Sequence, residues 1–127
     1  MLIQLRSVNK SYNKNRPNQV DALRGVSMSI NEGDLCAVSG PSGSGKSTLL
    51  KILGCLDKPT SGEYCLDGEN VGTFSDSKIS ALRNGRIGFI LQDFGLIDDR
   101  SVFENVSIPL YFSKTKKRNF GQLRLKR

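Results

Sequence analysis

The sequence contains no histidine and no tryptophan, and only three cysteines among its 127 residues. The lack of histidine removes the side chain that most often acts as a general base or a metal ligand near neutral pH. No C-x-x-C pair and no metal-ligand spacing relates the three cysteines, which are Cys36, Cys55 and Cys65. Each lies in an apolar segment, so we expect buried free thiols rather than a disulfide or a zinc site.

Long apolar runs are also missing. None approaches the ~20 residues that a helix needs to cross a bilayer. The N-terminus reads as a short strand and lacks the basic start and the apolar stretch of a secretory signal. We therefore expect a cytoplasmic protein, or one attached to a membrane from its cytosolic side.

Acidic residues are absent from the last part of the chain. Of the 19 Lys and Arg residues, seven lie in residues 114–127, which leaves 12 to balance the 12 Asp and Glu residues of the remaining chain. The net charge of +7 thus belongs to a basic tail on a neutral body. A nucleic-acid-binding protein places its basic residues on a recognition face, so nucleic acid is not the expected partner.

The hydrophobic pattern predicts an α/β protein in which short strands alternate with helices. Strands are expected at residues 2–8, 26–30, 35–39, 63–66 and 87–91, and helices at 47–56, 75–83 and 101–106. Residues 13–19 are polar and form a hairpin-like loop, and Pro109 is expected to stop the last helix. The strands at 35–39 and 87–91 are almost entirely apolar, which is typical of strands buried on both faces.

A glycine-rich loop lies between the strand expected at 35–39 and the helix expected from Ser47. Glycine lets backbone N–H groups wrap around a phosphate, and the following helix N-terminus also favours an anion. Lys46 is placed to bridge the β- and γ-phosphates of ATP, and the Ser47 hydroxyl is placed to bind Mg²⁺. A flexible loop without a ligand is the alternative, which the spacing and the strand–loop–helix context disfavour. The predicted nucleotide-binding residues are Gly40, Pro41, Ser42, Gly43, Ser44, Gly45, Lys46, Ser47 and Thr48.

The residues around this loop indicate which class of phosphate-loop proteins the chain resembles. LLKILGCLDKPTSGE at residues 49–63, IGFILQDFGLI at 87–97 and the segment 104–110 closely resemble the ATP-binding subunits of ABC transporters. Within that family the chain resembles most the group that powers lipoprotein release, macrolide export and antimicrobial-peptide resistance. The resemblance covers about residues 1–113 and implies a P-loop NTPase core of ABC ATPase type with an antiparallel β subdomain. A P-loop kinase or GTPase fits less well, since no Asn-Lys-x-Asp guanine-binding motif is present.

The resemblance implies roles for three further regions. Tyr12 stands where the family has an aromatic residue that stacks on adenine, although packing at a strand end is an alternative. Gln92 matches the glutamine that reaches Mg²⁺ and the attacking water, so with Lys46 it is a candidate catalytic residue; the alternative is a solvated side chain. The segment from Asp93 to Arg100 would face a transmembrane permease subunit, or be a plain solvated loop. The family also pairs two ATP-binding subunits on the cytosolic face of the plasma membrane.

The likeness to the family stops after about Ser113. The family's signature motif, its apolar strand ending in Asp-Glu and its histidine have no match in the chain. We therefore expect weak MgATP binding without hydrolysis at a family-like rate, and an exposed apolar edge at residues 35–38.

A frameshift or premature end best explains residues 114–127. The alternative is a non-catalytic regulator that docks on full-length relatives, with a tail that touches anionic lipid. The transported substrate is not specified by these residues.

Overall fold

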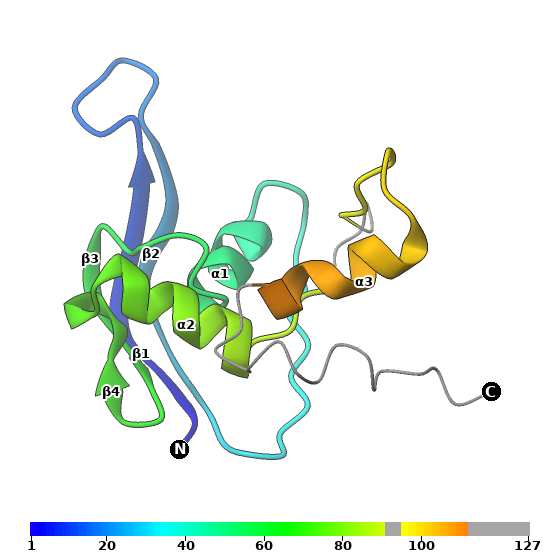
Figure 1. Cartoon of the computed structure of the whole chain (residues 1–127). Helices are drawn as coiled ribbons and strands as arrows, with labels where there is room; N and C mark the ends of the chain where they lie inside the picture. The colour runs from blue at the N-terminus through cyan, green and yellow to red at the C-terminus, as the bar shows by residue number, and fades with distance from the viewer. Residues whose placement is uncertain (91–94, 112–127) are drawn as a thin grey trace. The chain divides into compact units, whose positions relative to one another are not determined.

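The structure of the chain is a computed structural model that describes residues 1–90 and 95–111 (Figure 1). Gln92, Asp93 and the tail at 114–127 lie outside these residues. The chain divides into two compact units, Met1–Ile79 and Ser80–Arg127, and each is described by itself.

The first unit is built on an antiparallel sheet. Among the described residues it has four strands in the order β2-β1-β3-β4. Their bounds are Ile3–Tyr12 for β1, Val20–Ile30 for β2, Ser61–Leu66 for β3 and Glu69–Asn70 for β4. Figure 1 shows β1 and β2 side by side, joined by the polar loop predicted at residues 13–19. Both strands are longer than predicted, because their polar residues also pair, as far as Tyr12 with Val20.

The core of this unit lies between the sheet and helix α1, which spans Lys46–Leu53. Leu49 and Ile52 are three residues apart on the helix and share its buried face. The strands and the chain that follows them supply the other buried apolar side chains. The buried apolar residues are Leu5, Val8, Leu23, Leu49, Ile52, Cys55, Tyr64, Leu66, Val71, Phe74 and Ile79.

Helix α1 ends three residues earlier than predicted. The chain turns at Gly54, and Cys55 takes a left-handed conformation with φ of 56°. The Tyr64 hydroxyl on β3 donates a hydrogen bond of 2.7 Å to the Leu53 carbonyl at the helix end. Burial raises the pKa of the Tyr64 phenol well above its usual value, so the hydroxyl stays protonated and keeps this donor.

Three more helical segments follow the sheet in the described part of the chain. The short 3₁₀ turn η1 spans Val71–Thr73, and α2 spans Asp76–Arg86, close to the helix predicted at 75–83. Helix α3 spans Val102–Tyr111. It was expected to stop near Pro109 but continues past it, since a proline removes one backbone donor without obliging the helix to end there. None of the helices in the described ranges has the length and apolar character that a membrane crossing requires.

Two predicted strands are absent, and this corrects the sequence interpretation. Residues 31–40 are exposed and form no strand, with the Leu35 side chain fully exposed. Residues 87–90 are also without regular structure, and Ile90 is fully exposed; Leu91 lies outside the described residues. A parallel strand is stable only between neighbours that pair with its backbone and cover its faces. No strand in the described parts of the chain lies beside either segment.

The three cysteines differ in burial. All three lie in the described residues, and no disulfide joins them. Cys55 is buried and Cys65 is half-buried, but Cys36 is exposed because it belongs to the segment that does not form a strand.

Candidate functional site

The phosphate loop, which we define as residues 40–48, leads directly into α1. Gly40 and Gly45 have φ of 149° and 92°, values that side chains other than glycine rarely adopt. A Cβ atom at Gly40 would lie 2.8 Å from Ser44 Oγ, and one at Gly45 would overlap the Ala22 carbonyl and approach Leu23 Cδ2 to 3.0 Å. Both positions therefore require glycine, and the loop packs directly on the backbone of β2.

The N-terminus of α1 is suited to an anion. Gly45 is its N-cap, no side chain caps it, and its first turn carries no acidic residue. Its first backbone N–H groups and the positive end of the helix dipole are therefore left for a ligand. The Lys46 ammonium donates hydrogen bonds of 2.8 Å to the Gly40 carbonyl and 2.7 Å to the Pro41 carbonyl. The cation thus lies against the loop, where it would meet a bound phosphate.

The donor set fits Mg²⁺ only when phosphate is bound. Among the described residues no group of three Asp, Glu, His or Cys side chains could hold a metal ion. The Ser47 hydroxyl lies in the first turn of α1, and Ser47 is exposed. Mg²⁺ commonly takes one or two protein oxygens and completes its shell with phosphate oxygens and water. Ser47 fits that role, whereas Gln92, the second predicted ligand, lies outside the described residues.

Tyr12, the predicted adenine-stacking residue, is the last residue of β1. Its hydroxyl donates a hydrogen bond of 3.0 Å to Asp57 Oδ2. The Lys10 ammonium lies 5.0 Å from the centroid of the Tyr12 ring and 2.5 Å from Asp57 Oδ1. The ring is therefore held by its hydroxyl, and one of its faces carries a cation. Sequence reasoning missed Asp57, because no local pattern relates an aspartate to a tyrosine 45 residues earlier.

The hairpin formed by β1 and β2 carries Tyr12 and also contacts the phosphate loop. In the β1–β2 ladder Tyr12 pairs with Val20, and Lys10 pairs with Leu23. Gly45 packs on Ala22 and Leu23 of that ladder. The structure thus places the predicted base-stacking ring and the predicted phosphate loop at one part of the first unit.

The Asp57 carboxyl is held in its charged form. Burial acts to raise its pKa, but hydrogen bonds from Lys10, from the Tyr12 hydroxyl and from the Lys58 backbone N–H outweigh burial and lower the pKa below its usual value. The carboxylate is thus both charged and saturated with donors, which fixes its position.

This lowered pKa predicts an acid-dependent loss of stability. A group whose pKa is lower in the folded state stabilises the fold fully above its unfolded pKa of about 4, and this contribution is lost as pH falls through the folded value. Urea unfolding measured between pH 6 and pH 3 is expected to show a smaller fall in free energy of unfolding for Asp57→Asn than for the original chain. Other carboxylates are common to both proteins, so equal falls would contradict this assignment.

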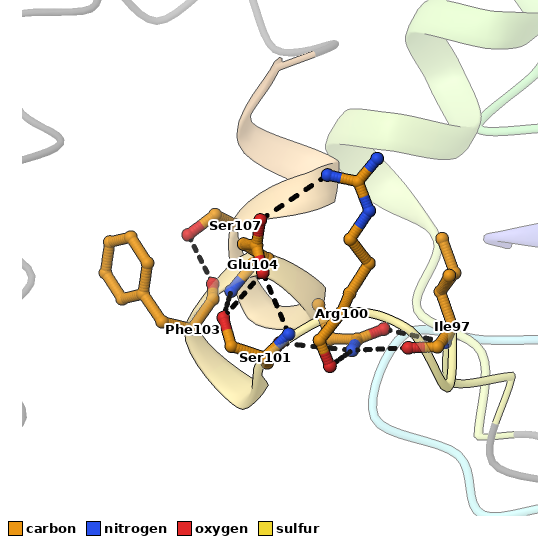
Figure 2. A network of polar contacts seen from close by, with 7 residues as sticks. Ile97, Arg100, Ser101, Phe103, Glu104 and Ser107 are labelled. Carbon is orange, nitrogen blue, oxygen red and sulfur yellow. Dashed lines mark hydrogen bonds and ion pairs between the residues drawn. The ribbon is translucent and has the colours of Figure 1, made fainter.

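In the second unit, the segment from Gly95 to Arg100 leads into α3 through a reciprocal cap (Figure 2). Ser101 Oγ accepts from the Glu104 backbone N–H at 3.3 Å, and Glu104 Oε2 accepts from the Ser101 backbone N–H at 2.8 Å. Ser101 Oγ also donates to Glu104 Oε2 at 2.8 Å. The bonds that this carboxylate accepts from the Ser101 backbone and side chain lower the pKa of Glu104. Asn105 Nδ2 donates to the Ile97, Arg100 and Ser101 carbonyls, and Asn105 Oδ1 accepts from the Ile97 N–H.

This cap presents an exposed apolar and acidic surface. Leu96, Val102, Phe103 and Val106 are all more than half exposed, and Asp98 and Asp99 are exposed beside them in the sequence. In the described part of the predicted partner-facing segment, Asn105 thus holds Ile97 and Arg100 to the start of α3. Asp93 and Phe94 lie outside the described residues.

Residues 40–47 have the spacing of the P-loop motif, G-x4-G-K-S, and they lead into α1 with the lysine against the loop carbonyls. The family model described as "ABC transporter" matches residues 23–126 of this chain. The chain therefore belongs to the ABC transporter family. The matched range extends into residues 114–126, so the boundary expected near residue 113 stays a prediction.

Relatives agree with this assignment. The chain is 48% identical over 114 residues to the pyoverdine export ATP-binding/permease protein PvdT of Pseudomonas fluorescens, covering 90% of this chain and 17% of that protein. It is 46% identical to the macrolide export ATP-binding/permease protein MacB of Syntrophobacter fumaroxidans, covering 88% and 16%. The predicted likeness to the macrolide-export group is thereby confirmed.

Solved structures confirm the predicted fold class. A dimeric ABC transporter cassette aligns with a TM-score of 0.80 at 42% identity, covering 87% of this chain and 47% of the cassette. The same cassette has also been solved in a post-hydrolysis state bound to ADP and Pi. The chain spans less than half the length of each of these relatives, and its matched part corresponds to part of an ABC ATP-binding domain.

Proposed function

We propose that this chain binds MgATP through the phosphate loop, as the ATP-binding part of an ABC transporter. The observation that carries the proposal is the loop itself, which joins glycines in backbone conformations that other residues rarely adopt, an uncapped helix N-terminus and the Lys46 ammonium. These features together suit a polyphosphate anion and would serve no purpose in a plain surface turn.

Each site residue has a distinct role in this proposal. The loop N–H groups and Lys46 hold the β- and γ-phosphates, and Ser47 binds Mg²⁺, which would neutralise phosphate charge when bound. Tyr12 stacks on adenine from the neighbouring strand end. Gln92, which lies outside the described residues, would reach Mg²⁺ and the attacking water. Lys46 and Gln92 are thus the catalytic residues that the chain itself offers.

We further propose that the chain works with two protein partners at the cytosolic face of the membrane. The first is a transmembrane permease subunit, which would contact the segment from Asp93 to Arg100. Exposed Leu96 and Ile97 support this, as does the joining of ATP-binding and permease parts in the relative's name. The second is another ATP-binding subunit, which the dimeric state of the related cassette supports.

Titration calorimetry with MgATP tests the proposed binding. We expect weak binding, with a Kd of about 0.1–1 mM, and release of inorganic phosphate no faster than the buffer background. Phosphate release is expected to be negligible because the chain has neither a histidine nor an apolar strand ending in Asp-Glu. No heat of binding at a few millimolar MgATP would contradict the proposed binding. Brisk phosphate release that Lys46→Ala abolishes would instead contradict the expected lack of turnover.

A further inference from the structure

We propose that Asp57 is a positioning residue for nucleotide-base recognition, because its carboxylate fixes the orientation of the Tyr12 ring relative to the phosphate loop. This inference rests on the proposed binding of MgATP and adds a residue that acts on the base without touching it.

The carboxylate is surrounded by donors on both oxygens. Oδ2 accepts from the Tyr12 hydroxyl at 3.0 Å. Oδ1 accepts from the Lys10 ammonium at 2.5 Å and from the Lys58 backbone N–H at 2.7 Å. The Lys10 and Asp57 side chains are only 13% and 27% exposed, so solvent competes less with these bonds than it does at an open surface pair. The tyrosine hydroxyl therefore has one well-placed acceptor.

Asp57 is itself fixed to the helix that begins at the phosphate loop. The backbone N–H groups of Leu56 and Asp57 both donate to the Lys51 carbonyl in α1, at 2.8 Å and 3.2 Å. The Tyr64 hydroxyl donates to the Leu53 carbonyl and ties the same helix end to β3. A displacement of Asp57 would thus have to disturb the end of α1.

The chain just after Asp57 is fixed to the strand that carries Tyr12. The Thr60 N–H donates to the Asn9 carbonyl at 2.8 Å, and Thr60 Oγ1 accepts from the Ser11 N–H at 3.0 Å. Asp57 therefore links two elements that the proposed ligand would bridge: β1 beside the base, and the helix that starts at the phosphates.

The consequence is a ring that is oriented before the base arrives. A tyrosine at a strand end can rotate about two side-chain bonds, and a stacking ligand must stop that rotation at a cost in affinity. The bond to Asp57 fixes the hydroxyl end, and Lys10 lies over one face of the ring. In this proposal a base would stack on the opposite face. Removal of the bond should lower affinity for the base and leave affinity for the phosphates unchanged.

Calorimetry of the 127-residue chain with two ligands, MgATP and magnesium tripolyphosphate, separates these effects. Tyr12→Phe keeps the ring and removes the hydroxyl, and Asp57→Ala removes the acceptor. We expect each variant to bind MgATP about three- to ten-fold more weakly, the effect of one hydrogen bond, and to bind tripolyphosphate within about two-fold of the original chain. Because both changes break the same bond, the double variant should be little weaker than either single variant.

Asp76→Ala is the matched control. Asp76 pairs with Lys58 at 3.1 Å, and its side chain is 95% exposed, so its removal changes the charge equally without touching Tyr12. This variant should bind both ligands like the original chain. Thermal melts followed by circular dichroism establish that each variant is folded, and if Asp57→Ala is not folded, Tyr12→Phe decides.

The outcomes distinguish the inference from the proposed function. Unchanged MgATP affinity in Tyr12→Phe and Asp57→Ala, with Tyr12→Ala clearly weaker, would show that the ring stacks without the help of Asp57. Equal losses for MgATP and tripolyphosphate would assign Asp57 a purely structural role. Either result overturns the inference and leaves ATP binding intact. If the original chain binds neither ligand, the proposed function fails, and this inference fails with it.

Discussion

Lys46→Ala is expected to weaken MgATP binding by about 100-fold or more. The ammonium lies against the loop, at 2.8 Å from the Gly40 carbonyl and 2.7 Å from the Pro41 carbonyl, where it would face a phosphate held by the loop N–H groups. A charge-assisted hydrogen bond contributes about 1.5–3 kcal/mol, and each factor of ten in affinity corresponds to about 1.4 kcal/mol. One such bond together with the lost charge attraction accounts for a change of this size.

Calorimetric titration of the variant and of a matched lysine variant measures this effect. Lys51→Ala is the control because Lys51 is exposed on the same helix and its substitution removes the same charge. It should change the Kd by less than about three-fold, the scale expected of an exposed charge. Melting curves are needed as well, because Lys46 also holds loop carbonyls in the free protein. Near-equal affinities of the two variants would show that the loop does not receive phosphate through Lys46.

Features that depend on neighbouring residues in the sequence could be predicted. The polar loop at 13–19 and the helices near 47–56 and 75–83 follow from turn residues and apolar spacing. The reciprocal cap that begins α3 was not predicted, although its residue types are local, with Ser101 three residues before Glu104. Element ends were less accurate, because strand length depends on a partner and helix α1 stops where Cys55 turns.

Features that depend on distant partners were not predicted. Residues 35–39 have the composition of a buried strand, but composition cannot supply the neighbours that such a strand must pair with. The same holds for residues 87–90, which the pattern also favoured as a strand. Apolar composition therefore marks a segment that could pair within a sheet. In the described residues of this chain, neither segment pairs with a strand.

Some residues of the candidate site could be predicted from the sequence and others could not. The phosphate loop is a contiguous motif, so the sequence alone could indicate it, and its role in binding phosphate stays a prediction. The role of Tyr12 came from family resemblance, and it stays a prediction. Asp57 was missed, because its bond to Tyr12 joins β1 to the chain after α1 and exists only in the folded unit.

The largest stability effect is expected at Gly62, where β3 passes an irregularity in β1. The register between these strands shifts between Arg6 and Asn9, and Ser7 within the shift has a φ of 46°. Gly62 has a φ of 88°; a Cβ atom there would overlap the Ser7 carbonyl and lie 2.7 Å from the Arg6 carbonyl. These neighbours are backbone atoms of a paired strand, so they cannot rotate away as a side chain would.

Gly62→Ala is therefore expected to lower the free energy of unfolding by about 3 kcal/mol or more, of which left-handed strain supplies about 1–2 kcal/mol and the overlap the rest. Gly33→Ala separates the two terms, since Gly33 has a similar φ of 83° and nothing within 4 Å of the added Cβ. The control should lose only the strain, about 1–2 kcal/mol. Urea unfolding of both variants measures the difference. Equal losses would mean that β1 moves away from β3 at little cost. In that case the strand that carries Tyr12 would be less firmly held than its hydrogen bonds to Thr60 indicate.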